Sequence, residues 1–134
     1  MTAREQPQGY ILVVDDVPVL ARLMADMLAT AGHRTVTAAN GQEALVHLRS
    51  GKPLPALILL ELDMPVMNGW EFRAAQQRDP LLNRIPVLIV SGEGDLHQHA
   101  SAMHVAGYLN KPVPLSHLLN SVSAVFRGAP APAG

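Results

Sequence analysis

Short, continuous apolar runs alternate with longer amphipathic segments along this chain, and this alternation is the strongest constraint on its fold. The clearest runs lie at Tyr10–Val14, 56–60 and 86–90. Runs of this length that do not alternate with polar residues favour strands buried on both faces of a parallel sheet. Two weaker strand candidates, Arg34–Ala38 and 107–109, suit the edges of that sheet.

The segments between these runs have helical periodicity. Apolar residues recur every three or four positions through 17–31 and 115–126, and Gly32 is a stop signal for the first helix. Shorter helical candidates lie at 41–50, 68–78 and 93–105, and the last of these has few large apolar residues. A strand followed by a helix occurs five times, which predicts an α/β protein with helices on both faces of one parallel sheet.

Length and composition fit a single folded domain. The chain has 134 residues, of which 49% are hydrophobic and 16% charged, and this composition excludes an intrinsically disordered protein. We predict a mobile leader at 1–9, a domain at 10–127 and a Pro/Ala/Gly-rich tail or linker stub at 128–134.

Charge and apolar content argue against several classes of partner. The net charge is −1, so we expect no nucleic-acid binding by the domain itself. No apolar run approaches the ~18–20 residues that span a bilayer, so we expect no membrane partner and a cytoplasmic location. The chain has no cysteine, which excludes disulfides and thiolate metal sites.

Polar side chains follow the predicted strands at the edge where ligands bind in such sheets. Asp15 and Asp16 follow the first strand, Glu61 the third, Ser91 the fourth, and Lys111 the fifth. Carboxylates about 5 Å apart repel by about 3 kcal/mol at an effective dielectric near 20, so a cation is needed. The acidic groups can bind Mg²⁺, while Ser91 and Lys111 can bind the oxygens of a phosphoryl group.

Each of these residues also has a plainer interpretation. The aspartate pair can simply cap the next helix, and the serine can belong to a turn. The Lys111-Pro112 pair can lie in a solvated loop. The specific feature is therefore their shared position at successive strand ends.

The motifs at these strand ends resemble the receiver domain of two-component response regulators, over residues 10–126. They read ILVVDD at 11–16, LILLELDMPVMNGWEF at 57–72, VLIVSGEG at 87–94 and GYLNKP at 107–112. The resemblance implies a flavodoxin-like, doubly wound five-stranded parallel sheet in the order 2-1-3-4-5, with five helices. It also implies a phosphorelay signalling module that is not an enzyme.

The resemblance gives a role to individual residues. The metal ligands for Mg²⁺ are Asp15, Asp16, Glu61 and the backbone carbonyl of Asp63; the phosphoryl-sensing residues are Ser91 and Lys111; the switch residue is Tyr108; and the candidate cis-proline is Pro112. The expected partner is a histidine kinase or a downstream signalling protein. It would bind the face formed by the fourth helix, fifth strand and fifth helix.

Glu61 departs from the family pattern, because it stands where the phosphorylated aspartate is expected. The extra methylene moves the carboxylate by about 1.5 Å, and a misplacement of about 1 Å can cost about 100-fold in rate. We therefore expect a poor phosphoacceptor whose carboxylate reaches toward Ser91 and Lys111 and partly imitates an aspartyl phosphate. The glutamate can be natural or introduced, and the sequence leaves both origins open.

Other functions fit the sequence less well. The Glu61-Leu62-Asp63 loop resembles that of aspartyl phosphotransferases, but glutamate is unsuited to be the nucleophile. A flavin or nucleotide binder would need a Gly-rich loop after the first strand. His97, His99 and His104 suggest either a metal site or solvated helix surface, and their spacing favours the second. We expect Phe72 in the core and Trp70 partly exposed beside the site.

Overall fold

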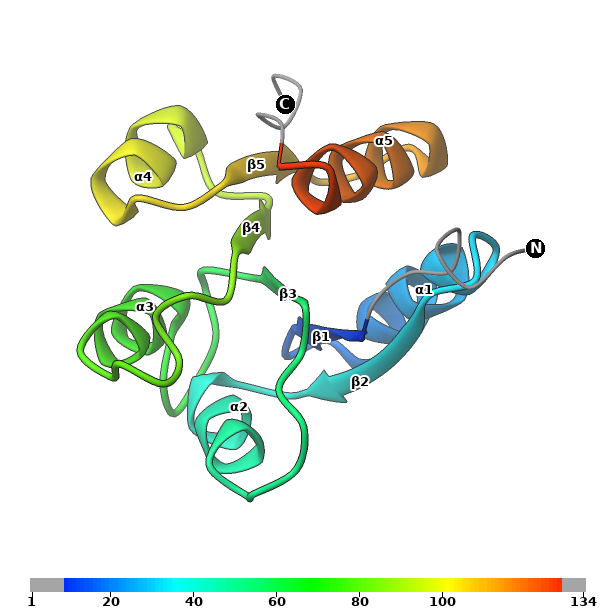
Figure 1. Ribbon diagram of the computed structural model, residues 1–134. Helices are drawn as coiled ribbons and strands as arrows, with labels where there is room; N and C mark the ends of the chain where they lie inside the picture. Colours follow the sequence, from blue (N-terminus) through cyan, green and yellow to red (C-terminus); the bar gives the residue numbers. More distant parts are fainter. Residues whose placement is uncertain (1–8, 129–134) are drawn as a thin grey trace.

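A computed structural model describes residues 9–128 of the chain. Five parallel strands form one sheet in the order β2-β1-β3-β4-β5, so the predicted flavodoxin-like fold is confirmed (Figure 1). The strands are β1 (Tyr10–Val14), β2 (Arg34–Ala38), β3 (Leu57–Leu60), β4 (Val87–Ser91) and β5 (Gly107–Asn110). The helices are α1 (Pro18–Ala29), α2 (Gly41–Leu48), α3 (Gly69–Gln77), α4 (Leu96–Met103) and α5 (Leu115–Phe126).

Helices cover both faces of the sheet. In Figure 1, α1 and α5 lie on one side, and α2, α3 and α4 lie on the other. Side chains of β1 alternate between the two layers: Leu12 and Val14 belong to the core cluster under α2–α4, and Ile11 and Val13 to the cluster under α1 and α5. This burial on both sides explains why the central strands are continuous apolar runs.

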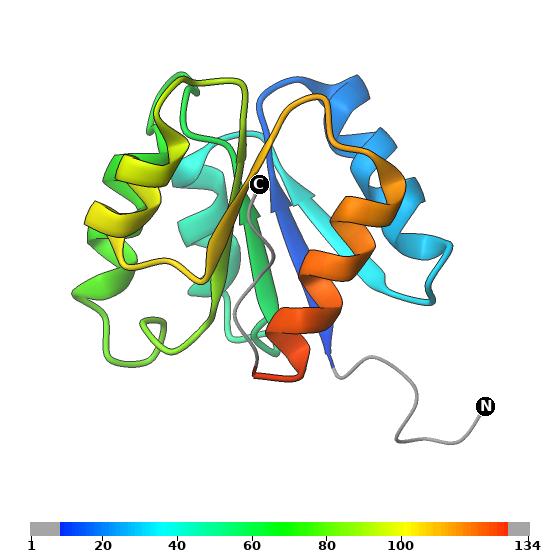
Figure 2. The ribbon, with the colours of Figure 1, turned by 90° about the horizontal axis from the view of Figure 1, so that it is seen from above.

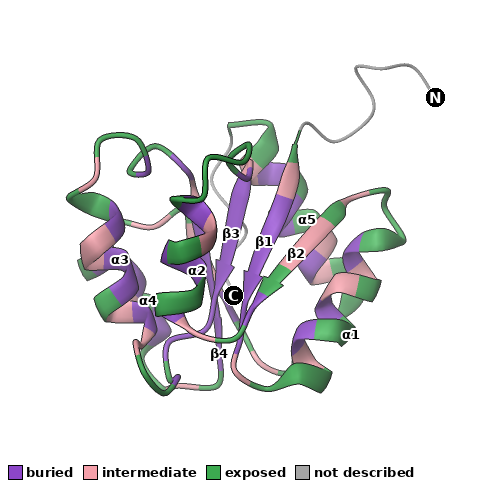
Figure 3. Ribbon diagram, turned by 90° about the horizontal axis from the view of Figure 1, so that it is seen from below, coloured by how far each residue is buried: buried purple, intermediate pink, exposed green. Residues whose placement is uncertain are grey.

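Burial separates the central strands from the edges. Every residue of β3 and β4 is buried, whereas β2 and β5 are only partly buried, as edge strands should be. Figure 3 shows this contrast between β3 and β2. The predicted leader and tail lie outside the described residues except for Gly9 and Gly128. Within 9–128, no helix is long and apolar enough to cross a membrane.

Three helices begin later than the sequence-based expectation, α1 and α3 by one residue and α4 by three. Pro18 is the first residue of α1, and Val17 precedes it as an exposed N-cap. Helix α4 begins at Leu96 rather than at 93, because Asp95 before it is left-handed with φ 56°. The segment 92–95 therefore remains a loop beside the end of β4.

The loop between β3 and α3 is held tightly against the end of the strand. A Cβ at Gly69 would meet the backbone carbonyl oxygen of Glu61, and the Gly69 N–H donates to the carbonyl of Leu62. Only a glycine permits this approach. It fixes the start of α3 next to the residue at the phosphoacceptor position.

Candidate functional site

The carboxyl edge of the sheet brings the predicted site residues together. Backbone hydrogen bonds continue the strand ladders beyond the strands themselves: the Glu61 N–H donates to Val14 O at 3.0 Å, and the Lys111 N–H donates to Ser91 O at 3.0 Å. The Asp15 N–H is fixed by Ala38 O in the same way. These side chains therefore start from neighbouring, rigid positions.

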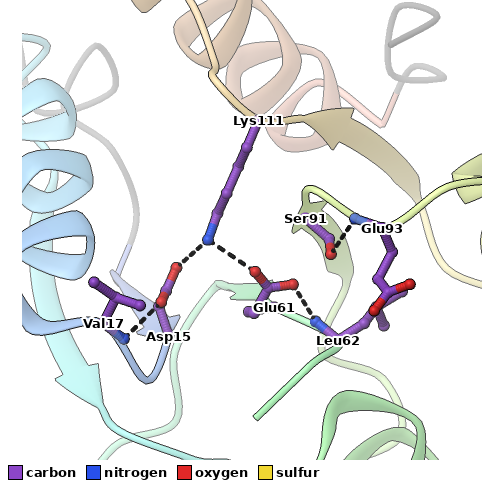
Figure 4. Close-up of polar contacts among 7 residues, drawn as sticks. All are labelled: Asp15, Val17, Glu61, Leu62, Ser91, Glu93 and Lys111. Carbon is purple, nitrogen blue, oxygen red and sulfur yellow. Dashed lines mark hydrogen bonds and ion pairs between the residues drawn. The ribbon is translucent and has the colours of Figure 1, made fainter.

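Lys111 lies at the centre of the site and pairs with two carboxylates (Figure 4). Its Nζ lies 2.6 Å from Asp15 Oδ2 and 2.9 Å from Glu61 Oε1. The side chains of Asp15, Glu61 and Lys111 are only 1%, 10% and 18% exposed. Burial by itself lowers the pKa of Lys111, but the hydrogen bonds and charges of Asp15 and Glu61 outweigh it and raise the pKa. The amine is therefore a firmly held cation.

The remaining carboxylate oxygens bind backbone amides. Asp15 Oδ1 accepts from the Val17 N–H at 2.9 Å, and Glu61 Oε2 accepts from the Leu62 N–H at 2.6 Å (Figure 4). Ser91 Oγ instead accepts from the Glu93 N–H at 3.1 Å. Glu61 was expected to reach toward both Lys111 and Ser91. One of its oxygens does contact Lys111, whereas the other accepts from the Leu62 N–H and not from the Ser91 hydroxyl.

An open cleft of about 500 Å³ lies over these groups. Its polar lining includes Asp16, Glu61, Asp63, Ser91, Glu93 and Lys111. Asp63 is exposed and lies in the β3–α3 loop. Glu93 was not among the predicted site residues, although its place two residues after Ser91 at a strand end is the same signal that identified the others.

Two further predicted residues lie on or after β5. The Lys111–Pro112 peptide bond is cis, in agreement with the expectation for Pro112. Tyr108 is half-buried, and its ring packs edge-on against His97 of α4, with centroids 6.0 Å apart. The position of Tyr108 thus couples β5 to α4.

The donor chemistry of the site suits Mg²⁺, but the side chains are arranged around Lys111. Carboxylate oxygens are the ligands that Mg²⁺ takes. Within residues 9–128, however, no three His, Cys, Asp or Glu side chains lie close enough together to hold a metal ion. Lys111 engages Asp15 and Glu61, so a divalent cation would have to displace the amine from at least one of them.

The three histidines near α4 have different neighbours and form no metal site in the described part of the chain. His97 contacts Tyr108, and His99 Nδ1 accepts from Trp70 Nε1 at 3.3 Å. His104 follows α4 and is exposed. Trp70 is half-buried as expected, but it packs against α4 and does not line the cleft.

Residues 11–123 match the model of the response regulator receiver domain. The five-stranded parallel sheet in the order 2-1-3-4-5 is also the fold of the solved receivers that this chain resembles. The chain therefore belongs to the response regulator receiver domain family, a class of two-component signalling modules.

Individual relatives agree with this assignment. Protein PilH of Pseudomonas aeruginosa is 31% identical over 120 residues, which cover 88% of this chain and 98% of PilH. The phosphorylated cyanobacterial phytochrome response regulator RcpA has 33% identity and a TM-score of 0.73, over 91% of both chains. The Mn²⁺-bound form of response regulator Rcp1 has 27% identity and a TM-score of 0.78, over 94% of this chain and 100% of Rcp1.

The length relation differs among relatives. The chain spans about half of the probable transcriptional regulator ycf27 of Porphyra purpurea, to which it is 27% identical, but nearly all of PilH. Receiver domains thus occur both within longer regulators and on their own. Receiver domains in general interact with histidine kinases and downstream proteins and bind Mg²⁺.

Proposed function

We propose that this receiver module, residues 10–127, works without phosphorylation, because Glu61 occupies the phosphoacceptor position. The observation that carries the proposal is the pairing of Glu61 with Lys111 at 2.9 Å inside a nearly buried site. In this reading, the glutamate supplies a permanent negative charge to the lysine that would otherwise bind a phosphoryl group. Ser91 and Lys111 are the sensing residues, and Tyr108 is the switch.

The arrangement of Glu61 argues against its phosphorylation. Both of its oxygens have hydrogen-bond donors, Lys111 Nζ and the Leu62 N–H. An attacking oxygen would have to leave one of them, and its position differs from that of an aspartate by one methylene. Such displacement is costly where in-line geometry is required. The same geometry speaks against phosphotransferase turnover.

The mimic is expected to be partial. A complete change of a two-state equilibrium from 1:99 to 99:1 needs about 5.5 kcal/mol. A carboxylate has two acceptor oxygens and less charge than a phosphoryl group, which has three. Because one oxygen of Glu61 accepts from the backbone N–H of Leu62, only the other is offered to Lys111.

The deciding experiment measures intact mass after incubation with Mg²⁺ and a small phosphodonor, for this protein and for Glu61→Asp. We expect only the Asp variant to gain a phosphoryl group, and only with Mg²⁺ present. That result would mean that Asp15, Asp16 and the Asp63 carbonyl form a competent metal site. If the unchanged protein gains a phosphoryl group, Glu61 is an acceptor and the proposal fails.

We also propose that the state of the site reaches a partner through α4, β5 and α5. The contact between Tyr108 and His97 supports this route, because it joins β5 to α4. Amide hydrogen exchange of Glu61→Ala should differ from that of the unchanged protein on these elements, with Val46→Ala on exposed α2 as the control. Equal exchange on that face in all three proteins would contradict the route.

A further inference from the structure

Charged side chains are segregated between the two edges of the sheet. Among residues 9–128, the carboxyl edge carries two cations, Lys111 and Arg22, and Arg22 lines a hollow there with Asp15 and Glu43. The same edge carries eight carboxylates: Asp15, Asp16, Glu43, Glu61, Asp63, Glu71, Glu93 and Asp95. The amino edge, where strands begin and helices end, carries one carboxylate among the described residues, Asp79, and six exposed cations: Arg34, Arg49, Lys52, Arg78, Arg84 and Arg127. The helices run between these two edges in Figure 2. The net charge of −1 therefore conceals two oppositely charged ends.

Interactions with helix ends explain the positions of three of the six cations on the amino edge. Arg49, Arg78 and Arg127 are the C-cap residues of α2, α3 and α5, where a cation interacts favourably with the helix dipole. The other three cations lie outside the helices. Their position on the same edge therefore needs a further explanation.

The amino edge is poorly neutralised from within the molecule. Arg49 Nε lies 3.6 Å from Asp79 Oδ2, and such exposed pairs contribute little. Arg78 lines a hollow of about 370 Å³ together with these two residues. The carboxyl edge is one helix length away, about 18 Å for a helix of 12 residues, or roughly two Debye lengths at physiological salt. Its carboxylates therefore do not cancel the field at the amino edge.

Exposed apolar side chains lie among these cations. Leu81, between Arg78 and Arg84 in the loop before β4, is 79% exposed, and Leu54 and Phe126 are also exposed on this edge. The loops of this edge are largely exposed in Figure 3. Cations interleaved with exposed apolar side chains suit the headgroup region of an anionic bilayer. Single-stranded nucleic acid would instead favour several free aromatic stacking platforms, whereas Phe126 is the one aromatic side chain among these three and its ring packs against His33.

We propose that the amino edge, defined by its six cations with Leu54, Leu81 and Phe126, docks on membranes that contain anionic phospholipids. The cations contact lipid phosphates, and Leu81 enters the headgroup region. The acidic carboxyl edge is repelled by the same surface and faces away from it. The cleft over Glu61 and Lys111 thus stays open to partner proteins. This differs from the sequence-based expectation of no membrane partner, which considered only segments long enough to span a bilayer and not surface docking.

Vesicle co-sedimentation of the full chain tests the proposal. We expect binding to phosphatidylcholine vesicles that contain phosphatidylglycerol, none to phosphatidylcholine alone, and weaker binding as salt rises. One cation near such a surface is worth about 5-fold in affinity, so Arg84→Glu should lose about 25-fold. Its matched control is Arg22→Glu, which makes the same charge change at an exposed position of α1. Its affinity for the vesicles should fall by less than about 2-fold.

A second pair of variants tests the apolar contact. Leu81→Ser should lose about 5-fold in affinity. Leu23→Ser changes an exposed leucine of α1 and should leave vesicle binding unchanged. Equal losses for Arg84→Glu and Arg22→Glu would overturn the proposal, because only total charge would then matter. Absence of vesicle binding at low salt overturns it too, and so does binding to single-stranded DNA in preference to anionic vesicles.

Discussion

Helices α3 and α4 are neighbours of nearly equal length, nine and eight residues, yet they are held in different ways. The Asn68 side chain accepts from the Glu71 N–H, and the Glu71 side chain accepts from the Asn68 N–H, so α3 begins with a capping box. Helix α4 begins after left-handed Asp95, whose side chain makes no cap hydrogen bond. Helix α3 is thus specified by its own sequence, whereas α4 depends on its surroundings.

Those surroundings are largely side chains of α3. Buried Arg73 donates to the carbonyls of Met103 at 3.0 Å and His104 at 2.7 Å, at the end of α4. Gln77 adds a longer hydrogen bond to Met103 O. Burial lowers the pKa of Arg73, but a guanidinium stays charged, and the negative end of the α4 dipole compensates that charge.

The largest effect is expected when this contact is removed. Arg73→Met should lower the free energy of unfolding by about 2–3 kcal/mol, because buried acceptors including Gln76 Oε1 lose their donor. Amide exchange should rise in α4 more than in α3. Arg22→Met, at an exposed site, is the control and should change stability by less than about 0.5 kcal/mol. Equal melting of Arg73→Met and the unchanged protein would show that α4 stands without α3.

A smaller effect is expected at the start of α3. Asn68→Ala breaks the capping box and should cost about 1 kcal/mol in urea unfolding, with faster exchange confined to the first turn of α3. Asn83→Ala, in the exposed loop before β4, is a control of the same chemistry. A loss that spreads equally over α3 and α4 would contradict the view that α3 is locally specified.

The smallest effect is expected for glycine substitutions just after α4 and α3, which should change stability in opposite directions. His104 is left-handed with φ 54°, so His104→Gly should stabilise the protein by about 0.5–1 kcal/mol while its backbone carbonyl still accepts from Arg73. Arg78, the C-cap of α3, has φ −80°, and Arg78→Gly should destabilise by about the same amount. Thermal melting of both variants measures the difference. The same sign for both would count against the backbone geometry as the cause.

The same contrast explains what the sequence could predict. The strands were recognisable because β1, β3 and β4 are buried on both sides, and the gathering of Asp15, Glu61, Ser91 and Lys111 followed from the rule that parallel strands end at one edge. The start of α4 was misplaced by three residues, because no capping side chain marks it. Patterns of neighbouring residues therefore predict an element correctly where those same residues determine its structure.

Other features depend on contacts between distant residues. Nothing in the pattern around Arg73 indicates that its guanidinium is buried against the end of α4. The return of one Glu61 oxygen to the Leu62 N–H depends on where Lys111 places its amine. The charge difference between the two edges also became visible only once the helices were placed.

The ion pairs of Lys111 also bear on how the chain acquires its stability during synthesis. The lysine lies 96 residues after Asp15 and 50 after Glu61, so it is synthesised after the first four strands of the sheet. Until then, two carboxylates that are almost completely buried in the finished protein have no cation beside them, and an unpaired buried charge costs several kcal/mol. We therefore expect a chain that ends before Lys111 to keep these two carboxylates in water, so that its first four strands are less stable than they are in the complete domain.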